Sequence, residues 1–266
     1  MDMRDALRNG SEEMQQIFRE LGAQMNARAE KEREQKVRNY RSLNARAEKG
    51  QILFTGSSLM EQFPIAELAL ALKLDKKVYN RGIGGFTTED FLREIDTVLF
   101  DLDPSVVFMN IGTNDFREWP DGRDWKNSLL KNYEDILRHC KERLPDSKFY
   151  LMAYYPVNGE LPDAEPGAVF MLKVRTNENL ADVNQEIAKL ATRYGYEFIP
   201  ASNEPSSRAC TDIWRMPRGS NTSQLYCASS LIPRQLAAGY LIYLCGCLSD
   251  STGENYSGYF LVLIFK

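Results

Sequence analysis

Three short polar motifs follow three apolar segments. Together they contain the residue types that are needed for nucleophilic attack on an acyl carbon. The first is Gly56-Ser57-Ser58, where the glycine permits a tight turn and a serine opens a helix. Ser58 is the candidate nucleophile, because its hydroxyl would face the end of the preceding strand, where helix amides favour negative charge. The alternative is that Ser57 or Ser58 only caps the helix.

A glycine-rich stretch follows the next apolar segment. The glycines within residues 80–88 leave backbone N–H groups free to approach a ligand, and a threonine can cap the next helix. The residues concerned are Gly82, Gly84, Gly85, Thr87 and Thr88. A nucleotide-binding module is the competing interpretation. It is disfavoured because the spacing is not G-x-G-x-x-G and no G-x-x-x-x-G-K-[ST] motif occurs in the chain.

The third motif, Gly112-Thr113-Asn114-Asp115, closes another apolar segment. Asn114 offers a side-chain N–H₂ group, which is the kind of donor that a developing oxyanion needs. Asn and Asp also form ordinary turns, so this motif alone allows a structural interpretation. Each motif alone has a structural interpretation, but three of them in this order, each at a strand end, together favour a functional site.

The elements that must position these motifs alternate between residues 51 and 204. We expect strands at Ile52–Thr55, Lys77–Asn80, Val106–Ile111, Phe149–Tyr154 and Glu197–Ile199. We expect helices near Ser58–Lys73, Thr88–Phe100, Asp124–Leu144 and Arg175–Tyr194. Apolar strands separated by helices predict a parallel sheet covered on both faces, a three-layer α/β/α sandwich. Its functional site would lie at the carboxyl ends of the strands.

Over about residues 51–200 the sequence resembles the SGNH (GDSL-type) hydrolase family. Residues 56–58 are similar to the G-D-S block of that family, Gly85 stands at the glycine of the second block, and residues 112–115 match the G-T-N-D block. The resemblance implies a flavodoxin-like α/β/α fold and the hydrolysis of small acyl or acetyl esters through an acyl-enzyme.

The resemblance also implies which residues act. Ser58 would be the nucleophile, and the oxyanion donors would be the backbone N–H groups of Ser58 and Gly85 and the side chain of Asn114. Losing one such donor typically costs about 10²–10³ in rate. We expect no cofactor and no metal, because the chemistry needs neither and the sequence has no evident metal-ligand cluster.

The sequence also departs from the family pattern. Ser57 and Phe86 stand where the family often has Asp, and the carboxyl-terminal Asp-x-x-His pair is missing. The single histidine, His139, falls on the polar face of a predicted helix, about 20 Å from the strand ends at ~1.5 Å per residue. A general base must come within ~3 Å of its proton, so we reject His139 as the base and expect impaired catalysis.

Two functions therefore stay open. The leading hypothesis is an esterase with a small-molecule ester substrate and an impaired triad. The alternative is a non-catalytic binding protein that uses Ser58, Gly85 and Asn114 to hold a small anionic or carbohydrate ligand.

Composition divides the chain into three parts. Residues 1–50 are highly charged and predict a helix that lies on the domain, with a partner-binding arm or a homo-oligomer contact as alternatives. Its apolar stripe is Met14, Phe18, Leu21 and Met25. Residues 51–204 form the hydrolase-like domain. Residues 205–266 hold nine serines, four of the five cysteines and only eight charged side chains. A reading-frame shift or other replacement after about Glu204, or a natural variable extension, would explain this segment.

The overall composition is that of an ordinary globular protein. The 266 residues are 43% hydrophobic and 26% charged, which excludes collagen-like and wholly disordered classes. A formal net charge of -4 disfavours a nucleic-acid partner. No apolar run reaches the ~18 residues that span a bilayer. We see no secretory signal and no zinc-type cysteine spacing, so we expect a cytoplasmic protein with reduced thiols.

Overall fold

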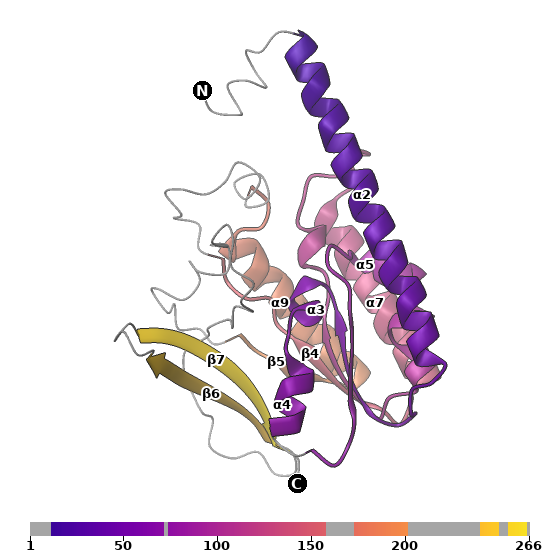
Figure 1. Ribbon diagram of the computed structural model, residues 1–266, viewed down its shortest axis with the longest axis vertical. Helices are drawn as coiled ribbons and strands as arrows, with labels where there is room; N and C mark the ends of the chain where they lie inside the picture. The colour runs from indigo at the N-terminus through magenta and orange to yellow at the C-terminus, as the bar shows by residue number, and fades with distance from the viewer. Residues whose placement is uncertain (1–11, 72–73, 158–172, 202–239, 250–254, 265–266) are drawn as a thin grey trace.

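The computed structural model describes residues 12–71, 74–157, 173–201, 240–249 and 255–264. A five-stranded sheet lies among the helices (Figure 1). Its strand order is β2-β1-β3-β4-β5, and every neighbouring pair is parallel. The strands are β1 (Ile52–Gly56), β2 (Val78–Gly82), β3 (Val106–Asn110), β4 (Lys148–Met152) and β5 (Glu197–Ile199). All five predicted strands are present, each overlapping its predicted range.

One face of the sheet packs on the two longest crossover helices. These are α7 (Trp125–Arg143) and α9 (Asn177–Tyr194). Leu53, Val107 and Leu151 point to this face from three neighbouring strands and are fully buried in a single apolar cluster with residues of both helices. Since alternate strand residues point to opposite faces, the residues between them build a second core.

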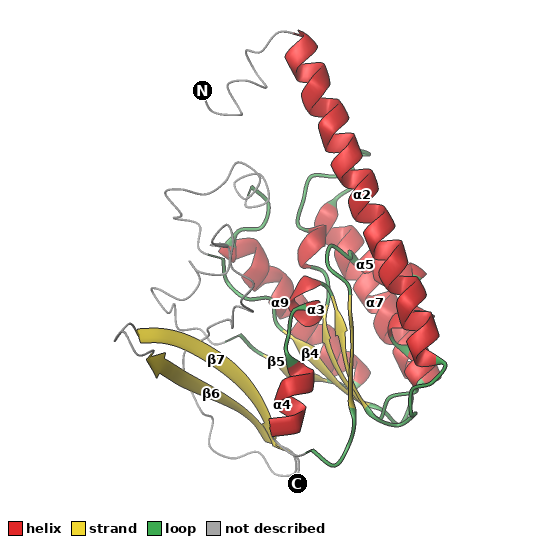
Figure 2. Cartoon of the chain, viewed as in Figure 1, coloured by secondary structure: helices red, strands yellow, loops and turns green. Residues whose placement is uncertain are grey.

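The opposite face is covered by two short helices, α3 (Ser58–Glu61) and α4 (Ile65–Ala71). Here the rings of Phe54, Phe108 and Tyr150 stack across three strands, with centroids 4.6 and 4.8 Å apart. Helices thus flank both faces of the parallel sheet (Figure 2), and the predicted α/β/α architecture is confirmed.

Two of the predicted helices are broken. Pro64 lacks an N–H group and separates α3 from α4, so the helix expected over Ser58–Lys73 becomes two. Glu94, at φ -108° and ψ 17°, leaves helical geometry within the helix expected over Thr88–Phe100. That segment forms α5 (Thr88–Arg93), α6 (Ile95–Val98) and the 3₁₀ turn η1 (Phe100–Leu102).

A single 33-residue helix, α2 (Glu12–Asn44), precedes the sheet. Its second half lies along the domain and buries Val37, whereas its first half extends beyond the rest of the described structure (Figure 1). Leu21 and Met25 of the predicted stripe are 50% and 65% exposed, as is Ile17 at 53%. The side chains of Met14 and Phe18 lie outside the described residues.

Near the end of the chain, β6 (Tyr240–Ser249) and β7 (Asn255–Ile264) pair as an antiparallel two-stranded sheet, separate from the five-stranded one. Residues 202–239 lie outside the described residues. Both interpretations of the 205–266 segment stay predictions.

Candidate active site

The proposed nucleophile, Ser58, begins α3 directly after β1. Gly56 has φ +142°, and a Cβ at that position would lie 1.9 Å from the carbonyl oxygen of Asn110, so the close approach of β1 and β3 requires glycine. Neither serine caps the helix. Ser57 occupies the N-cap position without a side-chain capping bond, and its buried hydroxyl has no partner among the described residues.

The electrostatic help expected from this helix is smaller than predicted. A helix dipole grows with the number of aligned peptide groups, and α3 has only four residues. This leaves the individual N–H group of Ser58, in place of a helix macrodipole, as the predicted donor.

The second motif forms the loop between β2 and α5. Gly82 packs against the backbone of α3, since a Cβ there would lie 2.3 Å from the Glu61 nitrogen. Gly85 adopts φ +81°, a conformation that favours glycine. A Cβ on Gly84 would lie 3.8 Å from the Cβ of Ser58, so this loop runs beside the proposed nucleophile.

Thr87 ends the loop as the N-cap of α5. Its hydroxyl accepts from the Asp90 N–H at 3.2 Å, and its own N–H donates to the Asp90 carboxylate at 3.0 Å, which completes a capping box. Of the two threonines expected as caps, Thr87 has this role.

Asn114 bonds to the last residue of the glycine loop, which consists of residues 84–86. Its Nδ2 donates to the carbonyl oxygen of Phe86 at 2.9 Å, and this bond uses one of the two amide hydrogens. Its Oδ1 lies 3.5 Å from Nη2 of Arg175, which also donates to the carbonyl oxygen of Thr113. Residues 84–86 therefore approach Ser58 through Gly84 and bond to Asn114 through Phe86, so the three predicted site residues all lie at or beside this loop.

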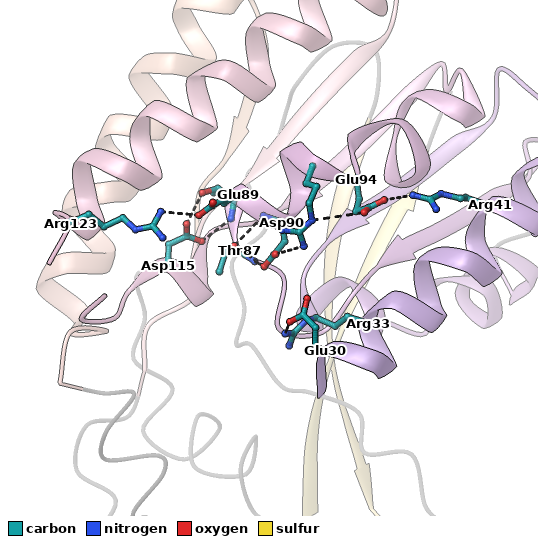
Figure 3. Close-up of polar contacts among 11 residues, drawn as sticks. Glu30, Arg33, Arg41, Thr87, Glu89, Asp90, Glu94, Asp115 and Arg123 are labelled. Carbon is teal, nitrogen blue, oxygen red and sulfur yellow. Dashed lines mark hydrogen bonds and ion pairs between the residues drawn. The ribbon is translucent and has the colours of Figure 1, made fainter. Parts of the chain in front are cut away.

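Asp115, the last residue of the third motif, is buried and bonds to Thr88. It is 2% exposed, and its carboxylate accepts from the N–H and the hydroxyl of Thr88 at 3.0 and 2.6 Å. Burial raises the pKa of Asp115 to about 6, although the bonds from Thr88 act in the opposite direction. This carboxylate ties the third motif to the first turn of α5 (Figure 3).

The second half of α2 contacts the glycine loop and the elements on either side of it. The Tyr40 hydroxyl donates to the Gly82 carbonyl oxygen at 2.9 Å. Arg41 pairs with Glu94 at 2.6 Å, as Figure 3 shows. Nη1 of Arg33 would be 3.1 Å from a Cβ on Gly85. Sequence reasoning missed these contacts because it looked for an apolar stripe, whereas most of them are polar.

Comparison with known proteins shows the family of the chain. The sequence profile of the GDSL-like Lipase/Acylhydrolase family matches residues 58–242. The chain belongs to this family. A candidate platelet activating factor from Streptococcus pneumonia is 31% identical, with a TM-score of 0.58, and the alignment covers 68% of this chain and 80% of that one.

A GDSL-like lipase from Bacteroides thetaiotaomicron VPI-5482 is more distant, at 19% identity and a TM-score of 0.49, over 62% of this GDSL-like hydrolase and 77% of the lipase. No curated protein matches the sequence. The family resemblance inferred from the three motifs is confirmed.

The single histidine of this GDSL-like hydrolase lies on the partly exposed face of α7. His139 is on α7, between the buried residues Leu137 and Cys140, with its side chain 39% exposed and Nδ1 3.8 Å from Glu142. It faces away from the apolar stripe of the helix, as predicted.

Within the ranges that the structure describes, no group of three or more His, Cys, Asp or Glu side chains could hold a metal ion. No helix in those ranges combines the length and the apolar character needed to cross a membrane. The cytoplasmic location stays a prediction.

Proposed function

We propose that this GDSL-type hydrolase cleaves small acyl or acetyl esters through an acyl-enzyme on Ser58. The observation that carries the proposal is the glycine loop, residues 84–86, which runs beside Ser58 at one end and accepts a hydrogen bond from Asn114 at the other. A nucleophile and backbone and amide donors around one point are what ester hydrolysis requires.

The reaction has two halves. The Ser58 Oγ forms a bond to the ester carbonyl carbon, and the resulting oxyanion is stabilised by the N–H groups of Ser58 and Gly85 and by Nδ2 of Asn114. Collapse expels the alcohol, and water then attacks the acyl-enzyme to release the acid and restore the serine. Both halves need a group that removes a proton.

The sequence offers no histidine for that role near Ser58. The serine proton then passes to solvent, which is a poor base, and loss of a triad histidine costs about 10⁴–10⁶ in related enzymes. We therefore expect slow acylation and still slower turnover.

Hydrolysis of p-nitrophenyl acetate, followed by mass spectrometry of the intact protein, tests the proposal. We expect one acetyl group on the wild-type chain, none on Ser58→Ala, and normal labelling of the matched variant Ser57→Ala. Equal release of p-nitrophenol by wild type and Ser58→Ala, with no adduct, would contradict the proposal and favour the binding protein. Rapid multiple turnover would mean that a base exists and that catalysis is not impaired.

A further inference from the structure

A carboxylate outside the predicted site joins the helix of Ser58 to the loop of Gly85. Glu61 is the last residue of α3, and its Oε2 accepts a hydrogen bond from the Gly84 N–H at 2.6 Å. Its Oε1 lies 2.5 Å from the Lys36 ammonium group on α2. One side chain thus connects α3, the glycine loop and the amino-terminal helix.

Helix α3 is too short to orient Ser58 without tertiary contacts, because helix nucleation is unfavourable and four residues add little propagation. Asn80 anchors the end of α3 by donating to the Met60 carbonyl oxygen at 2.5 Å. Glu61 adds a bond from the same end of the helix to Gly84. The Glu61 carboxylate thus adds a side-chain contact between α3 and the loop to the backbone packing of Gly82 on α3.

The loop needs such a contact because consecutive glycines have wide conformational freedom. Gly84 and Gly85 populate many backbone conformations in the absence of restraints, and the structure selects φ +81° for Gly85. A bond to the Gly84 N–H fixes the peptide plane directly before the one that carries the Gly85 N–H. The direction of the proposed oxyanion donor is set by that plane together with the φ and ψ angles of Gly84, so the bond removes one source of freedom.

Lys36 offsets the charge that this arrangement brings near the reacting centre. A lone carboxylate beside Gly84 would repel a developing oxyanion, whereas its ion pair with Lys36 cancels most of the local negative charge. The side chains of Lys36 and Glu61 are 39% and 25% exposed, so salt screens the pair in part.

We propose that Glu61 is a positioning residue that sets the Gly85 donor against Ser58, and that Lys36 neutralises it. The proposal rests on the esterase function proposed above. It separates two properties of Glu61: its oxygen atoms hold the loop, and its charge requires Lys36. Glu61→Gln keeps an acceptor for the Gly84 N–H without the charge, and Glu61→Ala removes both.

Amide hydrogen exchange measured by NMR reports the position of the loop without any need for turnover. We expect Glu61→Ala to raise the exchange rate of the Gly84 amide about tenfold or more, since a bond to an ionised acceptor is lost, and Glu61→Gln to retain most of the protection. Glu67→Ala, on the exposed surface of α4, is the matched control and should leave the Gly84 amide unchanged.

Binding of phenylboronic acid reports the oxyanion donors. The Ser58 Oγ donates an electron pair to boron, its proton passes to the buffer, and the tetrahedral boronate carries the negative charge. We expect about tenfold weaker binding to Glu61→Ala, near wild-type binding to Glu61→Gln, and weaker binding to Lys36→Met that Glu61→Gln restores in the double variant. The last result is not expected of a purely structural role.

Unchanged Gly84 exchange in Glu61→Ala would overturn the positioning proposal, as would equal losses in Glu61→Gln and Glu61→Ala. If Glu61→Ala fails to fold, Gly84→Ala replaces it, because the added Cβ would lie 2.7 Å from Oε2 of Glu61 and displace the carboxylate. Boronate binding that does not depend on Ser58 would contradict the esterase proposal instead, and Gly84 exchange would still decide whether Glu61 holds the loop.

Discussion

The two loops that carry the proposed oxyanion donors are held in opposite ways. The loop of Gly85 is bonded by the partly exposed Glu61 of α3, which pairs with Lys36, and Tyr40 of α2 bonds to Gly82 just before the loop. The loop of Asn114 is fixed from the interior. There the fully buried Tyr154 donates to the Ile111 carbonyl oxygen at 2.7 Å, next to Gly112.

This difference predicts that the Asn114 loop is rigid and that the Gly85 loop is adjustable. Contacts among buried groups depend little on salt and strongly on packing, whereas partly exposed ion pairs are weak and are screened by salt. The Asn114 loop should therefore keep its geometry under most conditions, and the Gly85 loop should respond to changes in α2. Paired substitutions in the two loops test this contrast.

The largest difference in the free energy of unfolding is expected between Gly112→Ala and Gly85→Ala. Gly112 has φ +119°, and its Cβ would lie 2.1 Å from the buried Tyr154 hydroxyl, so backbone strain and a lost hydrogen bond should together cost about 4 kcal/mol of unfolding free energy. Gly85 has φ +81° and meets only the flexible end of Arg33, so we expect about 1–2 kcal/mol. Urea unfolding of both variants checks this, and equal costs would contradict the contrast.

The next largest effect is expected in the pH dependence of stability, which involves the buried carboxylate of Asp115. The pKa of Asp115 rises from 3.8 to about 6 on folding, so the folded chain binds this proton more tightly than the unfolded chain. Its contribution to stability is therefore greatest below pH 4 and decreases by about 3 kcal/mol as the pH rises to 6. Arg117 opposes this shift and Asp90 adds to it.

Asp115→Asn should remove that decrease, because the amide keeps an acceptor for the Thr88 N–H but does not ionise. Unfolding free energies of wild type and variant between pH 4 and 6 measure the difference. An unchanged slope in the variant would show that Asp115 is not its source.

Tyr40→Phe, which alters the contact of α2 with Gly82, should have a smaller effect on stability. It deletes the hydroxyl that donates to the Gly82 carbonyl oxygen and leaves the ring in place. We expect a loss of about 1 kcal/mol in chemical unfolding, with faster amide exchange in the glycine loop than in the Asn114 loop. Equal changes in both loops would argue against separate support.

The smallest effect on stability is expected in the first half of α2. Leu21 is 50% exposed, so Leu21→Lys should change the unfolding free energy by no more than about 0.5 kcal/mol. A homo-oligomer through this helix stays a prediction, and light scattering of wild type and Leu21→Lys would test it. A monomeric wild type would contradict it.

The sheet and the three site motifs could be predicted because each leaves a local pattern. Val106–Met109 is a continuous apolar run, and Ser58 and Asn114 each lie within a few residues of the end of such a run. Pro64 also indicates a helix break, and the prediction of one continuous helix over Ser58–Lys73 did not take it into account.

Other features have no local pattern. Asp115 looks like a turn residue until the fold places Thr88 beside it, 27 positions away in the sequence. Glu61 and Tyr40 are ordinary polar residues of helices, and only the packing of α2 and α3 against the glycine loop gives them a role. Tertiary contacts between polar groups far apart in sequence determine these positions, and hydrophobic periodicity does not report them.

The early place of α2 in the chain has a consequence for biosynthesis. Asn44 donates to the carbonyl oxygen of Thr97 and accepts from Arg81, which leave the ribosome seconds later at about 5–20 residues per second. Within α2, pairs such as Arg28 with Glu32 each stabilise the helix by about 0.3–0.5 kcal/mol without any partner. The helix can thus form during translation, and the glycine loop can pack against it after leaving the ribosome.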